Sequence, residues 1–259
     1  YAQGWPLYEA RHDIPELGAP RPDLPFPQWR GEDLAGKRLL IFGEQGFGDQ
    51  IMFARFAPWL AARGAEVTLL CNPLLERLFG ALGVAVRAMS GRVEFPDPDA
   101  WVASGDVAGR AGVTLETLPN AAYLRGAARS SGGIGVAARG NPRHANDANR
   151  SLPPEQAARL LALPGALDLD PAATRAGDFQ DTADLIAGLD LVISVDTSVA
   201  HLAAAMGKPV WILIPTLMTD WRWGEAGETT PWYPTARLRR QPAPGDWASV
   251  IDAVEAELR

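Results

Sequence analysis

Residues Asp181–Leu213, DTADLIAGLDLVISVDTSVAHLAAAMGKPVWIL, decide the fold of this chain. Leu191–Val195 is a short apolar run rich in β-branched residues, which is typical of a strand buried on both faces. A helix is expected from Ser198, because apolar residues then recur at helical spacing until Gly207, a residue suited to a left-handed C-cap. A second buried strand is expected over Val210–Ile214. The stretch therefore predicts a β-α-β unit with a right-handed crossover.

The polar residues between the first strand and the helix of this unit are candidate ligand contacts. In open parallel sheets, ligands bind beyond the carboxyl ends of the strands. The candidates at that position are Asp196, Thr197, Ser198 and His201. The free N–H groups and the positive dipole end of the helix suit an anion such as phosphate. A purely structural interpretation stays open, in which Asp196 or Ser198 caps the helix and His201 is a hydrogen-bonded residue of a half-buried helix.

Composition limits the class of protein. The chain has 259 residues, of which 47% are hydrophobic, and a formal net charge of -7. This length allows one large domain or two small ones, and the negative charge argues against a general nucleic-acid or membrane-surface binder. Cys71 is the single cysteine, and no Cys and His cluster has metal-ligand spacing, so no metal site is predicted.

The sequence also carries expectations about the setting of the protein. It contains no apolar run long enough to span a membrane, and its start does not resemble a signal peptide. We therefore expect a cytoplasmic protein without a membrane span. The chain begins with Tyr1, not Met, so we expect it to be a piece of a longer protein.

A second β-α-β unit is predicted near the start of the chain. Lys37–Phe42 and Glu66–Cys71 have the composition of strands, and a helix is expected between them from about Gln50 to Arg63. Pro58 lies inside that helix and should kink or split it. The loop before the helix contains glycines that match neither a dinucleotide fingerprint nor a P-loop.

Within this loop, Gly46 and Gly48 allow close approach of the backbone to a ligand and permit positive φ. Asp49 follows them at the start of the helix, beyond the carboxyl end of the strand. It is either an N-cap or a carboxylate that accepts a proton from a substrate hydroxyl.

The second half of the chain starts with a predicted strand at Ile134–Ala138. The loop after it, Arg139–Ser151, reads RGNPRHANDANRS and contains three arginines, one histidine and three asparagines. Such a loop can be a solvated surface segment, but its position after a first strand and its many donors favour contact with an oxyanion. Arg150 and Asn141 are the candidate contacts in this loop.

The predicted organisation has four parts. A proline-rich leader spans 1–30 and is either a strap over the surface of its own domain or a junction to an upstream module. Two Rossmann-like domains follow at 31–130 and 131–245, with the boundary in the polar stretch Arg125–Gly133, and an amphipathic helix ends the chain at 246–259. The structures of 104–120 and 167–179 stay undetermined.

The motifs together resemble a known family. The early GxGD followed by a helix and the late DTSVAHLAAAMGKPVW resemble glycosyltransferase family 9, the heptosyltransferase-like enzymes of the GT-B fold. The resemblance is closer to the glycosyltransferase domain at the C-terminus of bacterial tetratricopeptide-repeat proteins. There GNPRHxNDxxRS, DTSVAHLAxAxGKPVW, DWRW and PWYP recur, and a GWPLYEAR-like segment joins the repeats to the enzyme. The resemblance covers nearly the whole chain and departs at Ala138, where such proteins commonly have Trp.

This resemblance implies a fold and an activity. The fold is α/β and GT-B-like, with two Rossmann-like domains whose parallel sheets face each other across a cleft. The activity is metal-independent transfer of a sugar from a nucleotide-sugar donor to an acceptor hydroxyl, with no further cofactor. The acceptor is expected on a protein such as flagellin, recruited by upstream tetratricopeptide repeats.

The resemblance also implies roles for individual residues. Asp49, in the glycine loop with Gly46 and Gly48, matches the acidic residue taken as the general base. The domain at 31–130 is then the acceptor side and the one at 131–245 the nucleotide-sugar side. Asp196, Thr197, Ser198 and His201 match the loop that binds the donor phosphates, and Arg150 and Asn141 are further donor contacts.

Other functions fit the same sequence. A catalytically inactive GT-B-like module that binds a nucleotide or a partner as part of a repeat scaffold is the main alternative, and Ala138 is consistent with it. A two-domain UDP-sugar epimerase has the same architecture. A nicotinamide-dependent oxidoreductase fits less well, because neither glycine loop follows the dinucleotide fingerprint.

Overall fold

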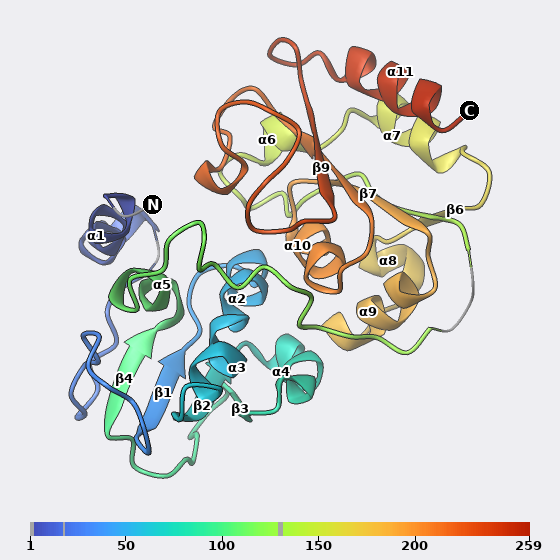
Figure 1. The fold of residues 1–259 in the computed structure, drawn as a ribbon. Coiled ribbons are helices and arrows are strands. Elements are labelled where there is room, and N and C mark those ends of the chain that lie inside the picture. Colours follow the sequence, from blue (N-terminus) through green and yellow to red (C-terminus); the bar gives the residue numbers. More distant parts are fainter. Residues whose placement is uncertain (1–2, 18, 129–131) are drawn as a thin grey trace. The chain divides into compact units, whose positions relative to one another are not determined.

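A computed structural model describes residues 3–17, 19–128 and 132–259 (Figure 1). Contacts between Cα atoms divide the chain into two units, Tyr1–Pro119 and Asn120–Arg259. Each unit has its own parallel sheet, and each is described below by itself. In the described residues, no helix has both the length and the apolar character needed to cross a membrane.

The sheet of the first unit has four parallel strands in the order β3-β2-β1-β4. The strands are β1 (Arg38–Phe42), β2 (Glu66–Cys71), β3 (Ala85–Ala88) and β4 (Ala100–Ala103). β1 and β2 are the strands predicted at Lys37–Phe42 and Glu66–Cys71. They lie in the middle of the sheet, where their apolar residues are buried on both faces.

The helix expected between β1 and β2 is split. It forms α2 (Phe47–Ala54) and α3 (Phe56–Ala61), separated at Arg55. Proline has no N–H to donate to the carbonyl four residues earlier, and for Pro58 that carbonyl belongs to Ala54, the last residue of α2. The split predicted from Pro58 therefore occurs one turn before the proline itself. The remaining helical elements of this part are α4 (Pro73–Phe79), η3 (Gly80–Leu82), η4 (Ser104–Asp106) and α5 (Val107–Arg110).

The leader is part of the first unit. It forms α1 (Gly4–Tyr8), η1 (Glu9–Asp13) and η2 (Pro15–Leu17), which precede an extended segment. Trp5 is buried and its indole N–H donates to the carbonyl of Val113 at 3.0 Å. The extended segment pairs with the edge strand β4, since the N–H of Trp29 donates to the carbonyl of Trp101 at 2.8 Å. The leader therefore packs on its own unit, and its role as a junction to an upstream module stays a prediction.

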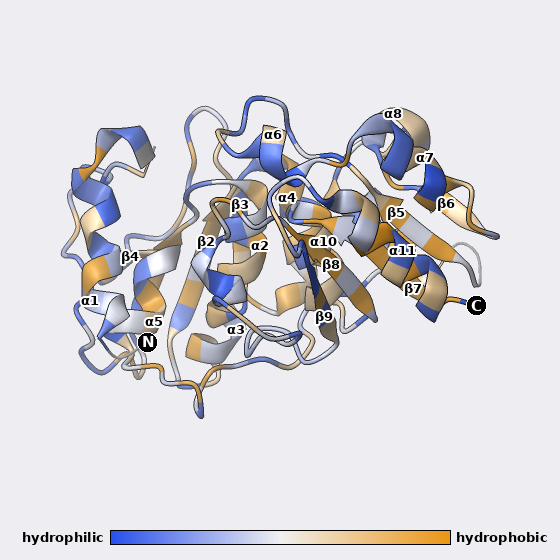
Figure 2. Ribbon diagram, turned by 90° about the horizontal axis from the view of Figure 1, so that it is seen from above, coloured by the Kyte–Doolittle hydropathy of each residue, from blue (hydrophilic) through white to orange (hydrophobic). Residues whose placement is uncertain are grey.

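The sheet of the second unit has five parallel strands in the order β6-β5-β7-β8-β9. They are β5 (Ile134–Ala137), β6 (Ala166–Asp168), β7 (Leu191–Val195), β8 (Val210–Ile214) and β9 (Ala236–Arg240). β7 and β8 have the bounds expected from their apolar runs. In Figure 2, β5 and β7 are coloured mainly as hydrophobic, as expected for strands covered on both faces.

Helices cover both faces of this sheet. α7 (Pro154–Leu161) and α11 (Trp247–Glu257) share one buried apolar cluster with side chains of β5, β7 and β8. α9 (Phe179–Ala187) and α10 (Ser198–Ala205) lie on the opposite side in Figure 1. The shorter helices are α6 (Asp147–Arg150), α8 (Pro171–Thr174) and η5 (Trp221–Trp223). α11 is therefore an integral layer of the second unit.

The division between the units differs from the predicted boundary after residue 130. It falls between Pro119 and Asn120. The residues after it bond into the second unit, because the N–H groups of Tyr123 and Leu124 both donate to the carbonyl of Ala205, at 2.9 and 3.2 Å. Composition placed the boundary at the polar stretch, whereas the backbone joins the second unit before that stretch begins.

Candidate functional site

The crevice between β5 and β7 is the topological switch point of the second sheet. The chain passes from β5 to β6 on one side and continues with β7 on the other side of β5. In open parallel sheets, ligands bind at such a point, beyond the carboxyl ends of the strands. The segments that begin at Ala138 and at Asp196 follow these two strands, so both predicted ligand loops flank one crevice.

The helix that starts at this crevice has no side-chain cap. Thr197 is the N-cap residue of α10 and makes no capping hydrogen bond with its side chain. Its hydroxyl lies 3.2 Å from the hydroxyl of Ser194. Ser198 is the first residue of the helix. The N-cap residue of α10 is therefore neither Asp196 nor Ser198, the two caps of the structural interpretation.

Asp196 occupies a half-buried position between β7 and α10. Burial raises the pKa of its carboxyl from an ordinary value of 3.8 to about 6, and the negative charge of Asp220 contributes in the same direction. The indole of Trp223 and the guanidinium groups of Arg222 and Arg150 oppose this rise in the pKa. Asp196 therefore changes charge close to neutral pH.

His201 is buried against aromatic residues. Its Nδ1 lies 2.8 Å from the hydroxyl of Tyr233, and its ring centroid is 5.2 Å from that of Trp223. Trp232 and Tyr233 are themselves buried, so most of the aromatic segment after β8 is packing, while Trp221 is 41% exposed. The structure places His201 in the first turns of α10, within a hydrogen-bonded aromatic cluster.

Arg150 connects the two loops of the crevice. Its guanidinium donates to the carbonyl of Asp196 at 2.8 Å and to Asp147 Oδ1 at 3.2 Å. A Cβ on Gly140 would lie 2.3 Å from Asp147 Oδ1, so only glycine fits beside this ion pair. Arg150 thus holds the loop after β5 against the loop after β7.

Asn141 has a local role in the same loop. Its Oδ1 accepts the backbone N–H of Arg143 at 3.0 Å, a hydrogen bond two residues along the chain that stabilises a turn. The side chain of Asn141 is exposed. Its predicted contact with a donor stays a prediction beside this observed structural contact.

Two arginines of this loop, Arg139 and Arg143, have their side chains exposed to solvent. Within the described residues, neither guanidinium takes part in a side-chain hydrogen bond or ion pair. Sequence reasoning selected Arg150 from the loop because of its motif. The structure makes Arg139 and Arg143 better candidates for an anionic ligand, since their donors are not used by the fold.

The corresponding place in the first unit is the switch point between β1 and β4. Asp49 lies in the first turn of α2, after the loop that leaves β1. Its Oδ2 accepts the backbone N–H of Gly46 at 3.1 Å and so caps the helix. Neither Gly46 nor Gly48 has a positive φ, so the positive φ that these glycines permit is not used. The left-handed residue of the loop is instead Gln45, with φ 61°.

The leader fills the crevice between β1 and β4. Arg11 is buried, bonds to Glu44 after β1, and lies 2.7 Å from Asp106 Oδ1 after β4. His12 Nε2 lies 3.2 Å from Asp106 Oδ2. His12, Glu44 and Asp106 bring ligand atoms within 4.8 Å of one another, an arrangement that can hold a metal ion. In this structure the Arg11 guanidinium supplies the positive charge there, because it pairs with both carboxylates.

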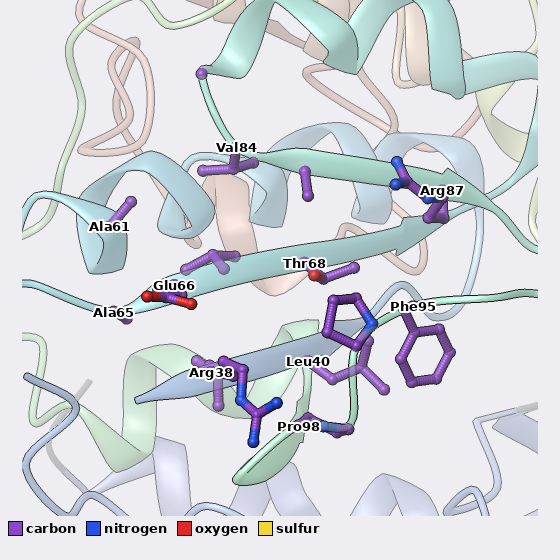
Figure 3. A pocket seen from close by; sticks show the side chains of 15 residues that line it. Arg38, Leu40, Ala61, Ala65, Glu66, Thr68, Val84, Arg87, Phe95 and Pro98 are labelled. Atoms are coloured by element: carbon purple, nitrogen blue, oxygen red, sulfur yellow. The ribbon is translucent and has the colours of Figure 1, made fainter. Parts of the chain in front are cut away.

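A pocket of about 400 Å³ lies elsewhere in the first unit (Figure 3). Its lining includes Arg38 and Glu66, the first residues of β1 and β2, and the ring of Phe95. Arg38 and Glu66 are at the amino ends of their strands, whereas ligands of parallel sheets bind at the carboxyl ends. Arg38 is paired with Asp99 at 3.3 Å. We therefore do not place the candidate site in this pocket.

Two parallel α/β units of this kind define the GT-B class of fold, and comparison with known proteins agrees. Residues 175–221 match the family model of glycosyltransferase family 9 (heptosyltransferase). The resemblance of the chain to this family, expected from its motifs, is thereby confirmed.

A curated relative is Protein FlbA of Caulobacter vibrioides, 29% identical over 314 aligned residues. The alignment covers 99% of this chain and 52% of FlbA, so the chain spans about half the length of that relative.

Solved structures show the same fold. The Escherichia coli heptosyltransferase WaaC with ADP-2-deoxy-2-fluoro heptose aligns with a TM-score of 0.56 at 14% identity, over 85% of this chain and 98% of WaaC. The family 9 glycosyl transferase of Veillonella parvula aligns with a TM-score of 0.55 at 11% identity, over 87% and 91% of the two chains. The iron-containing dodecameric glycosyltransferase TibC of enterotoxigenic E. coli aligns with a TM-score of 0.56 at 15% identity, over 85% and 67%.

Proposed function

We propose that this chain is a glycosyltransferase that moves a sugar from a nucleoside-diphosphate donor to an acceptor hydroxyl. The observation that carries the proposal is the N-terminus of α10, which lies at the β5–β7 switch point without a side-chain cap. Its N–H groups and dipole suit the donor phosphates. WaaC, which has this fold, was solved with an ADP-sugar analogue.

The second unit supplies the donor site in this proposal. Arg139 and Arg143 can pair with the diphosphate through charge-assisted hydrogen bonds. Charge develops on the leaving nucleoside diphosphate during transfer, and helix N–H groups together with arginines stabilise that charge. Thr197 and Ser198 begin α10 at the same place, and His201, whose Nδ1 lies 2.8 Å from the hydroxyl of Tyr233, is in the same helix. In this reaction scheme no metal ion is required.

The first unit supplies the base. Asp49 is half-buried at the carboxyl end of β1, which is the side of a parallel sheet where substrates bind. A carboxylate at this place can accept the proton of the acceptor hydroxyl as the oxygen attacks the sugar. The acceptor is proposed to be a protein such as flagellin, recruited by tetratricopeptide repeats in a longer chain. The cytoplasmic setting expected from the sequence stays a prediction.

Binding and turnover of nucleotide-sugars test the proposal. We expect one class of nucleoside diphosphate to raise the melting temperature, since a ligand at about 100 times its Kd stabilises by about 2.7 kcal/mol. Arg143→Glu should abolish this stabilisation, whereas Glu225→Gln, an exposed change elsewhere in the second unit, should leave it intact. Failure of every nucleoside diphosphate at millimolar concentration to stabilise the protein would refute the donor site.

Turnover separates an enzyme from an inactive module. Asp49→Asn should lower turnover of the bound donor about 10²–10⁴-fold, because general-base help is lost, with the Kd of the donor unchanged. The alternative of an inactive binding module rests on Ala138, which is buried in the apolar cluster of the second unit. That alternative predicts nucleotide binding without transfer or hydrolysis of any donor by the wild-type protein.

A further inference from the structure

The residue before the glycine loop has an unusual backbone conformation. Gln45 has φ 61°, in the left-handed region that favours glycine. A non-glycine residue in this region costs about 1–3 kcal/mol, and such residues persist only where their surroundings fix them. The chain has glycines on either side, at Gly43 and Gly46, yet it uses glutamine at the left-handed position. The contacts of the Gln45 side chain account for this choice.

The amide of Gln45 lies between the leader and Asp49. Its hydrogen-bond network is satisfied when the oxygen accepts from Arg11 Nε and from the hydroxyl of Tyr8, both at 3.1 Å. In that orientation its nitrogen donates to Asp49 Oδ1 at 3.2 Å. The other carboxylate oxygen, Oδ2, accepts the N–H of Gly46 at 3.1 Å. Both oxygens of Asp49 are thus held, and the plane of the carboxylate is fixed.

The support behind Gln45 is rigid. Arg11 donates to the carbonyl of Tyr8 at 2.9 Å, lies 4.3 Å from the centroid of the Tyr8 ring, and pairs with two buried carboxylates. A Cβ on Gly105 would lie 2.8 Å from Glu44 Oε1, 2.9 Å from the Arg11 guanidinium and 3.1 Å from the ring of Tyr8, so these side chains fill the space beside Gly105.

We propose that Gln45 is a positioning residue for the general base, and that the leader acts through it. This inference rests on the proposed function, in which Asp49 accepts the proton of the acceptor. The chain of contacts runs from Arg11 and Tyr8 to the Gln45 oxygen, and from the Gln45 nitrogen to Asp49. Glutamine is retained at a left-handed position because glycine cannot make these hydrogen bonds.

Gln45→Gly separates this role from a structural one. Glycine adopts the left-handed conformation without strain, so the variant should fold with a melting temperature equal to or above that of the wild type. We expect kcat to fall about 10- to 100-fold, because small misplacement of a reacting group has effects of this size, while KM for the donor stays unchanged. Gln45→Asn, whose amide is one methylene shorter, should lose kcat similarly.

Arg175→Gly is the matched control. Arg175 also has a left-handed φ, 59°, at the end of α8, and its side chain is exposed. This change should leave both kcat and KM at the wild-type level. A Gln45→Gly variant with full kcat, in a wild-type background that transfers sugar, would overturn the positioning role and leave the proposed function standing.

A measurement that does not depend on turnover tests the positioning role of Gln45 separately from the proposed transferase function. The side-chain carboxyl carbon of Asp49 gives an NMR resonance that reports its hydrogen bonds. We expect this resonance to move in Gln45→Gly and to stay in place in Arg175→Gly. An unmoved resonance in Gln45→Gly would overturn the inference, whether or not the protein transfers sugar. Absence of sugar transfer by the wild-type protein would count against the proposed function alone.

Discussion

The charge of the candidate donor site depends on pH, because Asp196 gains or loses a proton there. Its pKa is raised from 3.8 to about 6 in the folded protein, mainly by burial. Between these values the folded protein keeps a proton that the unfolded chain has released. The free energy of unfolding therefore falls as the pH rises through this window, and the loss is complete above the folded pKa.

Asp196→Asn should remove this dependence. The asparagine side chain does not titrate, so the stability of the variant relative to wild type should increase from pH 4 to pH 7, by about 1–2 kcal/mol after allowance for the partial exposure of the site. Urea unfolding at several pH values measures the difference. Glu225→Gln, at an exposed position of the same unit, should keep the wild-type slope. An Asp196→Asn slope equal to that of wild type would refute the assignment.

At the scale of single residues, the sequence predicted positions better than roles. Asp49 and Asp196 both follow strands at the carboxyl side of their sheets, as expected from apolar runs and loop positions. The role of Arg150 could not be predicted, because its partner is the backbone carbonyl of Asp196, 46 residues away. The hydroxyl that contacts His201 likewise comes from Tyr233, 32 residues further along the chain.

At the scale of elements, strongly patterned segments were predictable and weakly patterned ones were not. β7 and β8 have the expected bounds because their apolar runs are continuous. β9, ARLRR, was not predicted, since three of its five residues are arginines. It is an edge strand in which only Ala236 and Leu238 are buried, and charged residues on an edge protect a sheet from further pairing.

A substitution in α5 tests whether the leader packs against this helix. A Cβ on Gly109 would lie 2.9 Å from Cβ of the buried Trp5. Gly109→Ala should therefore lower the free energy of unfolding by about 1–3 kcal/mol, the usual effect of overpacking. Denaturant titration measures this change.

Gly80→Ala, at the end of α4 in the same unit, is the control for this substitution. Gly80 has a helical φ of -54° and no atom within 4 Å of an added Cβ. The free energy of unfolding of Gly80→Ala should rise by about 0.4–1 kcal/mol, because alanine reduces the entropy of the unfolded chain. Equal effects of the two substitutions would show that Trp5 does not pack against α5 in solution.

At the scale of the whole molecule, the two switch points differ in what occupies them. In the first unit, the crevice between β1 and β4 contains Arg11 paired with Glu44 and Asp106. In the second unit, the crevice between β5 and β7 is bounded by the first turn of α10 and by exposed arginines. In the proposed function, the same strand topology therefore supplies a general base in one unit and an anion site in the other.

This difference predicts where a nucleotide acts on the backbone. ADP, UDP or GDP, whichever binds, should slow amide hydrogen exchange in 139–150 and 196–201 at least several-fold, because binding stabilises the segments that contact the ligand. Exchange in 4–17 and 43–49 should stay unchanged, since the leader already fills the first crevice. Protection centred on 43–49 would place the nucleotide in the wrong unit.

The buried ion pairs of Arg11 make the leader a contributor to the stability of the first unit. A shortened version starting at residue 31, where the first domain was predicted to begin, would lack Arg11 and His12. The side chain of Glu44, 6% exposed, would then lose its cation, and that of Asp106, 0% exposed, would keep only Arg110 among the described residues, at 3.3 Å. Breaking a buried pair costs about 3–5 kcal/mol. A shortened or fused version of this chain therefore has to keep residues 4–13 together with the first unit.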